Sequence, residues 1–463
     1  MKEQDISRRR FLRNMGIFSG AAAAGALASM CTRAEDTSAP SAAEGGMTLR
    51  TNHNTGDEVS LLGFGCMRFP TKGSTNGGDD PTLDQDAINE LIATAHENGV
   101  NYYDTSPAYC RGQSEAATGE ALSHFPRDSY FIATKMSNFA PQTWSFEESK
   151  NIFENSLRNL RTDYIDYYLL HAIGMGGMEA FNQRFVDNGI LPWLIEQKKL
   201  GRIRNLGFSF HGPRDAFDDF LAMMDRGEVH WDFVQIQLNY IDWANVEEQQ
   251  GRNVNADYLY AELHKRNIPA IIMEPLLGGR LADVPKPVAD KMKSRRPDDS
   301  IPSWAFRFAG SPEGILTVLS GMTYMEHLRD NLHTFSPLVP LNDDELAFLA
   351  SAALEILRNN PIPCNYCNYC MPCPYGIDIP GTFKHYNTCV SEGNVPRATT
   401  DPNYERERRA FLYGYDRSVP RLHQATRCIT CGSCLPHCPQ AIDIPERLHE
   451  IQAYAESLRQ NKL

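Results

Sequence analysis

The sequence predicts an α/β chain in which a (β/α)8 TIM barrel precedes a smaller, mostly helical C-terminal domain. From position 59 to about 335, short apolar runs alternate with longer amphipathic stretches, as expected for repeated βα units. Near the C-terminus, eight of the twelve cysteines lie in two tight runs at metal-ligand spacing. A length of 463 residues accommodates a large barrel and a second module.

Eight apolar runs have the length and composition of buried strands. They are Ser60–Gly65, Val100–Asp104, Tyr130–Lys135, Tyr164–His171, Ile203–Ser209, Phe233–Gln237, Ala270–Glu274 and Leu316–Ser320. Helical patterns lie between them, for example at Asp84–Asn98, Phe146–Asn159, Ala256–Arg266 and Met325–Phe335. This alternation fits a closed barrel, but a doubly wound parallel sheet shares it.

Polar residues close three successive strands of this series. Asp104 ends one strand and Tyr109 lies in the loop after it, while Lys135 and His171 end the next two strands. The C-terminal ends of barrel strands meet at one mouth, where barrel enzymes have their active sites. Each residue alone has an ordinary explanation, such as a helix cap or a solvated end. Together they favour an active site at this mouth. They also favour the barrel over the doubly wound sheet.

These four residues match the Asp-Tyr-Lys-His tetrad of the aldo/keto reductases in order and in position on the strands. Three further segments resemble the same family: 201–211 (GRIRNLGFSFH), 233–240 (FVQIQLNY) and 274–281 (EPLLGGRL). The resemblance covers nearly all of residues 48–335. It implies a barrel over 48–340 and an oxidoreductase that acts on a carbonyl or alcohol with NAD or NADP.

Carbonyl reduction explains the four residue types. Negative charge develops on the substrate oxygen as hydride arrives, and a phenol can donate a proton there, although its usual pKa of about 10 is high for an acid catalyst. An adjacent ammonium lowers that pKa. The resemblance therefore makes Tyr109 the general acid, Lys135 the cation beside it and Asp104 the partner of Lys135. His171 would orient the carbonyl and stabilise the oxyanion.

The resemblance also implies contacts to the nicotinamide cofactor, from residues near its carboxamide, pyrophosphate and adenosine. These residues are Ser209, Gln235, Leu276, Gly278, Gly279, Gly321 and Asn331. The chain departs from the family pattern where many members stack an aromatic residue on the nicotinamide, because it has Met273 there. It also has Gly321 and His327 where many members bind the 2′-phosphate with Lys and Arg. The choice between NAD and NADP is therefore open.

The C-terminal cysteines predict two [4Fe–4S] clusters. The second run follows the bacterial ferredoxin spacing Cys-x₂-Cys-x₂-Cys-x₃-Cys-Pro, and the first run is one residue shorter before its last cysteine. Zinc sites also use Cys-x₂-Cys pairs, but they seldom string four cysteines in one run before a proline. The expected ligands are Cys364, Cys367, Cys370, Cys373, Cys428, Cys431, Cys434 and Cys438.

Resemblance to two-cluster ferredoxins implies that the last cysteine of each run binds the other cluster. One cluster would then use the set Cys364, Cys367, Cys370 and Cys438, and the other the set Cys428, Cys431, Cys434 and Cys373. A motif that follows both runs, at 376–380 and 441–445, favours a duplicated unit. Helical patterns at Asp343–Arg358 and Tyr404–Tyr413 predict a mostly helical ferredoxin-like domain over 341–463. The other cysteines of this part and of the barrel, Cys66, Cys110 and Cys389, are expected to be structural.

The N-terminus is typical of an export signal. Residues 7–13 read Ser-Arg-Arg-Arg-Phe-Leu-Arg and precede an apolar, alanine-rich stretch over 16–30. The paired Arg8 and Arg9 resemble the twin-arginine signal, which carries folded proteins. We expect a signal over 1–34, a linker over 35–47 and a periplasmic or otherwise extracytoplasmic protein. A lipid-anchored form through Cys31 and a cytoplasmic protein are the alternatives.

Composition restricts the partners. The net charge of −13 argues against nucleic acid, and no apolar run reaches the 18 residues that a spanning helix needs. The resemblance and the cysteine runs make the leading hypothesis an oxidoreductase with a small carbonyl or alcohol substrate and a redox partner protein, in which electrons pass through the clusters. Loop Ile173–Asn188 is the expected lid. The alternative is an electron-transfer subunit whose barrel serves only as a docking scaffold.

Overall fold

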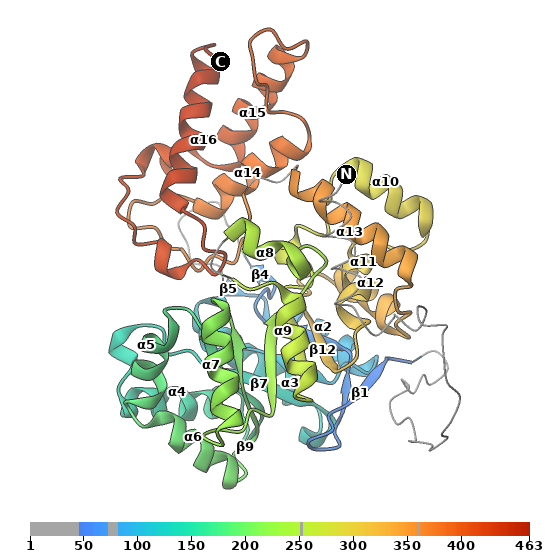
Figure 1. The fold of residues 1–463 in the computed structure, drawn as a ribbon, viewed down its shortest axis with the longest axis vertical. Coiled ribbons are helices and arrows are strands. Elements are labelled where there is room, and N and C mark those ends of the chain that lie inside the picture. The colour runs from blue at the N-terminus through green and yellow to red at the C-terminus, as the bar shows by residue number, and fades with distance from the viewer. Residues whose placement is uncertain (1–45, 73–81, 251–252, 359–361) are drawn as a thin grey trace, which may run out of the picture. The chain divides into compact units, whose positions relative to one another are not determined.

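The computed structural model describes residues 46–72, 82–250, 253–358 and 362–463 (Figure 1). The expected signal, Cys31 and nearly all of the expected linker lie outside these residues. Within the described part of the chain, no helix is long and apolar enough to cross a membrane.

Eight parallel strands form a closed barrel in which each strand pairs with the next along the chain, and the last pairs with the first. The strands are β3 (Leu62–Gly65), β6 (Tyr102–Asp104), β7 (Phe131–Met136), β8 (Ile165–Ile173), β9 (Ile203–Phe210), β10 (Phe233–Gln237), β11 (Ala270–Met273) and β12 (Ile315–Ser320). The predicted TIM barrel is confirmed, and the doubly wound sheet is excluded because the sheet has no open edge.

Aromatic rings fill the N-terminal end of the barrel. The Tyr167 ring packs edge-on against Tyr102 and Phe233, at centroid distances of 5.0 and 5.1 Å. A hairpin of β1 (Leu49–Thr51) and β2 (Glu58–Ser60) precedes the barrel, and Asn52 in its turn donates a hydrogen bond to the Tyr167 hydroxyl (3.0 Å). This end is therefore packed, so a functional site belongs at the opposite end, where the tetrad residues lie.

Amphipathic helices lie outside the strands (Figure 1). They are α2 (Gln85–Glu97), α3 (Ser114–Leu122), α4 (Phe146–Asn159), α6 (Ile190–Lys199), α7 (Arg214–Asp225), α9 (Ala256–Lys265), α11 (Ile301–Gly310) and α12 (Met325–Phe335). Two begin with side-chain caps: Asp84 accepts a hydrogen bond from the Ala87 amide, and Ser145 accepts one from the Glu148 amide.

Three helices, α14 (Ile379–Ser391), α15 (Tyr404–Ser418) and α16 (Ile444–Arg459), contact one another in pairs. They enclose an apolar core that includes Phe383, Phe411 and Leu448. The repeated Ile-Asp-Ile-Pro motif starts α14 and α16: Asp378 and Asp443 cap these helices, and a proline follows in the first turn. The predicted helical ferredoxin-type domain is confirmed, and the repeat is explained as a duplicated helix start.

The chain divides into two compact units. Among the described residues, the first holds those from 46 to 244, 254–275 and 303–347. The second holds the described residues of 245–253, 276–302 and 348–463. Besides the cysteine runs, the second unit therefore includes α10 (Lys286–Arg295) and most of α13 (Asp343–Arg358). Lys291 of α10 pairs with Glu355 of α13 at 2.7 Å. The single boundary at residue 340 between the barrel and the ferredoxin-like domain stays a prediction.

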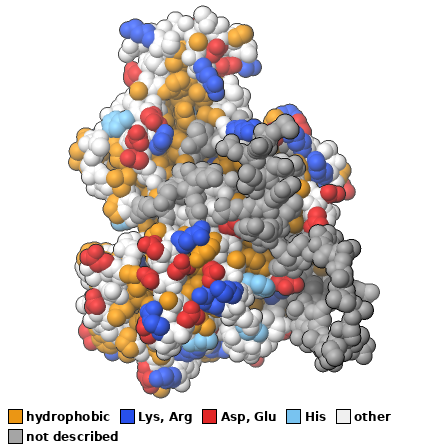
Figure 2. All heavy atoms as spheres, in the orientation of Figure 1, with side chains coloured by type: hydrophobic (Ala, Val, Ile, Leu, Met, Phe, Trp, Pro, Cys, Tyr) orange, Lys and Arg blue, Asp and Glu red, His pale blue; other side chains and the backbone are white. Residues whose placement is uncertain are grey.

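Charges of both signs are interspersed on the face drawn in Figure 2, with apolar side chains between them. This mixture is typical of a solvated surface.

Candidate active site and cluster sites

Asp104, Tyr109 and Lys135 come together at the C-terminal end of the barrel. Asp104 ends β6, Lys135 lies in β7, and both are almost fully buried. The Lys135 ammonium donates to Asp104 Oδ1 (2.5 Å) and to the Thr105 carbonyl (2.8 Å). The same ammonium lies 4.7 Å from the centre of the Tyr109 ring. The structure therefore places a buried cation beside a phenol and binds that cation with a carboxylate.

Burial dominates the electrostatics of this ion pair. It lowers the pKa of Lys135 and raises the pKa of Asp104, while the attraction between the two side chains opposes both shifts. Because each charge has lost its water, each depends on the other to stay ionised.

The turn after Tyr109 is conformationally strained. Cys110 and Arg111 both have left-handed backbones, with φ of 49° and 53°. Such residues cost about 1–3 kcal/mol each and persist only where their surroundings impose them. The Cys110 thiol donates to the carbonyl of Met67 (3.4 Å), which holds the turn against the loop after β3.

His171, in β8, lies next to Tyr109. The two rings are 5.9 Å apart and nearly perpendicular, and Phe139 lies on another side at 4.8 Å. The Nδ1 atom of His171 is hydrogen-bonded to the Ser137 hydroxyl (2.6 Å) and lies 3.3 Å from that of Ser106. These two serines therefore orient the imidazole through Nδ1.

The imidazole of His171 is neutral at physiological pH. Burial holds its pKa well below the usual value. The nearby Lys135, Arg184 and His211 side chains lower this pKa further. All these neighbours are basic, so protonation of His171 would add a positive charge to an already positive region.

The expected cofactor residues fall in both compact units. Ser209, Gln235, Gly321 and Asn331 belong to the first unit, and the 276–279 segment belongs to the second. The Gln235 amide oxygen is buried and accepts no hydrogen bond in the described structure, whereas Asn331 donates to the Ser320 hydroxyl (2.9 Å). An unsatisfied acceptor inside the barrel strand β10 fits a ligand with N–H donors, such as the carboxamide of a nicotinamide.

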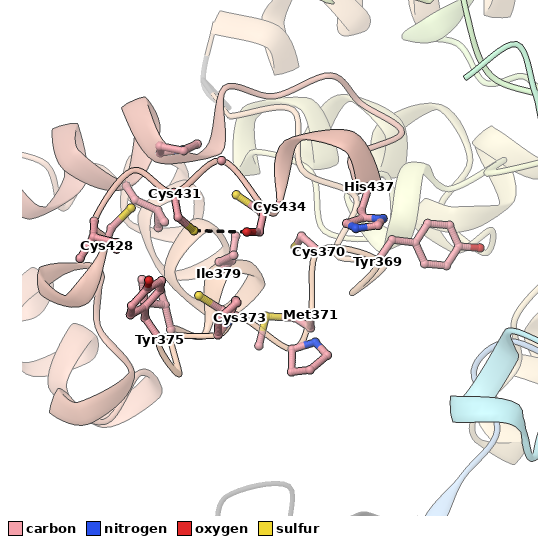
Figure 3. Close-up of a pocket in the computed structure, with 18 residues that line it drawn as sticks. Tyr369, Cys370, Met371, Cys373, Tyr375, Ile379, Cys428, Cys431, Cys434 and His437 are labelled. Carbon is pink, nitrogen blue, oxygen red and sulfur yellow. Dashed lines mark hydrogen bonds between the residues drawn. The ribbon is translucent and has the colours of Figure 1, made fainter. Parts of the chain in front are cut away.

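The eight cysteines of the two runs line two cavities in the second unit. One cavity, of ≈ 20 Å³, has the cysteines 364, 367, 370 and 438 in its wall. The other, of ≈ 260 Å³, has 373, 428, 431 and 434 together with 370 (Figure 3). The two walls thus contain the two four-cysteine sets expected for the clusters.

Both cysteine loops turn in the same way. The residue before the second cysteine of each run is left-handed: Tyr366 has φ 56° and Thr430 has φ 60°. The Tyr366 amide consequently points at the Cys364 sulfur and donates to it (3.4 Å). Amide donors to ligand sulfurs are a common means of stabilising iron–sulfur clusters.

The spacing of the thiols fits a cluster better than a single ion. Among the described residues, no three His, Cys, Asp or Glu side chains converge closely enough to hold one metal ion. A zinc site needs four ligands around one centre, whereas a cube distributes them over four corners. Burial raises the pKa of Cys364 and Cys370 to about 12, so these thiols ionise only when a metal compensates their charge.

The loop after β11 packs against the first cysteine run, within the second unit. Gly278 is left-handed (φ 68°), and a Cβ there would lie 1.9 Å from the carbonyl oxygen of Asn365. Arg280 is buried and lies close enough to Cys364 to lower the pKa of that thiol. Burial raises the same pKa by more. The backbone expected near a pyrophosphate is therefore in contact with a neighbour of a cluster ligand.

Three residues near the tetrad were not predicted from the sequence: Ser106, Ser137 and Arg184. Ser106 follows the end of β6 by two residues and Ser137 follows the end of β7 by one, which is a weak signal. Arg184 lies inside the expected lid, and nothing in its local sequence distinguishes it from a solvated arginine.

A closed (β/α)8 barrel with a buried Asp-Lys pair beside a tyrosine and a histidine defines a class of oxidoreductase barrels. Residues 61–353 match the family model "Aldo/keto reductase family", and residues 363–442 match "4Fe-4S dicluster domain". The chain belongs to the aldo/keto reductase family and is an oxidoreductase of that family with an attached 4Fe–4S dicluster domain.

Several relatives support the barrel assignment. L-galactose dehydrogenase from Arabidopsis thaliana is 26% identical over 67% of this chain and 95% of its own length. The NADH-specific methylglyoxal reductase of Escherichia coli is 24% identical over 65% of this chain and 96% of its own. An aldo-keto reductase from Klebsiella pneumoniae, solved with NADPH, shares the fold (TM-score 0.50, 20% identity, 65% of this chain and 93% of its own).

Proposed function

We propose that the barrel transfers hydride between a nicotinamide and a carbonyl or alcohol substrate, and that two [4Fe–4S] clusters exchange electrons with that site. The buried Lys135 ammonium, 2.5 Å from the Asp104 carboxylate and 4.7 Å from the Tyr109 ring, carries the first part. A cation there favours the phenolate. Tyr109 can therefore donate its proton during carbonyl reduction and accept one during alcohol oxidation.

His171 positions the substrate oxygen in this proposal. Nδ1 lies 2.6 Å from the Ser137 hydroxyl, and in this proposal the hydroxyl donates to it, which leaves the imidazole proton on Nε2. A neutral imidazole can then donate its Nε2–H to the carbonyl oxygen and stabilise the negative charge that develops there.

The nicotinamide site rests on Gln235, whose buried amide oxygen has no partner in the described structure. A nicotinamide, when bound, supplies or accepts the hydride. The NADPH of the Klebsiella structure and the NADH in the name of the Escherichia coli relative support a nicotinamide for this chain. Titration of the full chain with NADH and with NADPH tests the proposal. If neither binds, the barrel is a scaffold and hydride chemistry is excluded.

The electron-transfer part rests on the two thiol-lined cavities. We assign one cluster to the set 364, 367, 370 and 438 and the other to the set 428, 431, 434 and 373. Each cluster, when bound, carries one electron, so two clusters match the two electrons of one hydride. Exchange of these electrons with the outside requires a redox partner protein.

Gly278→Ala is expected to remove one cluster. The added methyl group would overlap the Asn365 carbonyl, so the first cysteine run has to shift away from its cavity. Iron and acid-labile sulfide in anaerobically purified protein should then fall by about half, because one of two equal clusters is lost.

Gly393→Ala is the matched control for this change. Gly393 is also left-handed (φ 70°) and in the second unit, but a Cβ there meets nothing within 4 Å. The control should retain wild-type iron and sulfide. Full iron content in Gly278→Ala would show that the loop and the cysteine run do not depend on each other.

We also propose that the protein is exported by the twin-arginine route. Arg8 and Arg9 precede Phe11 and Leu12, and an alanine-rich stretch follows. Wild-type protein should occur outside the cytoplasm with its N-terminus near Ser29, and replacement of both arginines by lysine should retain it inside. Unprocessed wild-type protein in the cytosolic fraction would contradict export.

A further inference from the structure

A buried arginine lies behind the catalytic histidine. Arg184 is in a π-helical turn, η5 (Asn182–Val186), and is 5% exposed. Its guanidinium donates to the His171 carbonyl oxygen (2.8 Å) and to the Asn138 amide oxygen (3.3 Å). These contacts use two of the five N–H donors of a guanidinium. Both acceptors are neutral, so the hydrogen bonds do not compensate the charge.

Arg184 has no anionic partner in the part of the chain that the structure describes. Burial lowers its pKa to about 10, and no carboxylate opposes that effect. Arg307, which is equally buried, differs in this respect: it makes a bidentate ion pair with Glu345 (3.0–3.1 Å). A buried arginine is normally paired in this way, because an isolated buried charge is strongly destabilising.

The guanidinium of Arg184 lies at the edge of the barrel mouth. It packs over the rings of Phe185 (4.6 Å) and Phe139 (5.3 Å). The Phe139 ring is 39% exposed and is also 4.8 Å from the His171 imidazole. Through this shared ring, the guanidinium is at most about 10 Å from the imidazole that would hold the substrate carbonyl.

The surroundings of His171 are positively charged. The groups that act electrostatically on it are Lys135, Arg184 and His211, and all three are basic. The carboxylate of the tetrad, Asp104, is already bound to Lys135. The site therefore has one compensated and one uncompensated cation.

We propose that Arg184 binds a carboxylate of the substrate, so that the barrel acts on carbonyl compounds that carry a carboxylate group, such as oxo acids. This inference rests on the proposed function. A planar carboxylate with one negative charge matches a guanidinium fork with three unused donors, and binds it in a bidentate manner. The ligand then supplies the counter-charge that the chain does not provide.

Two pairs of probes test this specificity: pyruvate with methyl pyruvate, and succinic semialdehyde with its methyl ester. Within each pair the carbonyl is similar and only the carboxylate is masked. For the full holoprotein, the ratio of kcat/KM for acid over ester should fall about ten- to a hundredfold in Arg184→Met, as for the loss of a charged hydrogen bond. Because each ratio comes from one preparation, partial misfolding of the variant cancels. Arg184→Lys should recover part of the ratio.

Arg214→Met is the control. Arg214 also follows a barrel strand, but it is exposed and its guanidinium lies 3.9 Å over the Tyr258 ring, so the acid-to-ester ratio should not change. An unchanged ratio in Arg184→Met, with both esters turned over, would overturn the inference and make Arg184 a brace for the His171 backbone.

A binding experiment separates this inference from the proposed function. If wild-type protein turns over none of the four probes, hydride chemistry on carbonyls fails, and calorimetry with oxamate and its neutral analogue oxamide still tests Arg184. Oxamate binding that exceeds oxamide binding in wild type, and not in Arg184→Met, supports the carboxylate site. Equal binding of the two in wild type overturns it.

Discussion

Replacement of Tyr109 by Phe should lower the rate of carbonyl reduction by about 10²–10⁴-fold, the usual effect of removing a general acid. The ring remains in place, so its packing against His171 and its contact with the Lys135 ammonium are preserved. Affinity for the nicotinamide should therefore persist. Steady-state turnover and nicotinamide titration of the same preparation measure the two effects.

Tyr103→Phe provides the matched control. Tyr103 is in β6, the strand that precedes Tyr109, and its buried hydroxyl donates to the Val100 carbonyl (3.0 Å). Its loss should cost only about 1 kcal/mol of stability, as expected for a neutral hydrogen bond, and leave turnover intact. Wild-type turnover in Tyr109→Phe would rule out a catalytic role for Tyr109.

Replacement of Lys135 by Met should destabilise the protein by about 3–5 kcal/mol and abolish turnover. The change leaves Asp104 as a buried carboxylate whose charge is no longer compensated. The double variant Asp104→Asn/Lys135→Met removes both charges and should regain much of that stability without regaining activity. Denaturant midpoints and turnover are measured for Asp104→Asn, for Lys135→Met and for the double variant, which completes a double-mutant cycle.

An exposed ion pair serves as the control for this cycle. Lys286 and Asp290 are 2.8 Å apart at side-chain exposures of 82% and 63%, so Lys286→Met should change stability by no more than about 0.5 kcal/mol. If Lys135→Met unfolds at the wild-type midpoint, the buried pair does not stabilise the barrel mouth. Recovery of turnover in the double variant would contradict the role of the ammonium.

The barrel could be predicted from the sequence because its strands are short, continuous apolar runs between strongly amphipathic helices. Four elements agree with the structure at both predicted ends: Phe146–Asn159, Phe233–Gln237, Met325–Phe335 and Asp343–Arg358. Other elements differ by one or two residues at one end or both, for example β7, which ends at Met136 instead of Lys135. The helix predicted at Tyr404–Tyr413 extends five residues further, to Ser418. Strand ends depend on pairing with a neighbour, which a local pattern does not encode.

The tetrad could be predicted because its members close successive strands, and the topology of a barrel then brings them together. The partners of His171 and the placement of Arg184 could not. Arg184 contacts the backbone of a residue 13 positions earlier, through a turn whose π-helical geometry has no local signature. The contact of the 276–280 loop with the first cysteine run likewise depends on tertiary packing between segments far apart in the chain.

The central claim is that the clusters and the nicotinamide exchange electrons. Anaerobic protein with oxidised clusters is mixed with reduced nicotinamide, and dithionite-reduced protein, freed of excess reductant, is mixed with oxidised nicotinamide. Both directions are needed because cluster potentials span about −700 to +450 mV. We predict that, in one direction, cluster absorbance changes in step with nicotinamide absorbance, and that two clusters change redox state for each nicotinamide converted. No cluster change in either direction, while the same protein reduces a carbonyl with added nicotinamide, would contradict it.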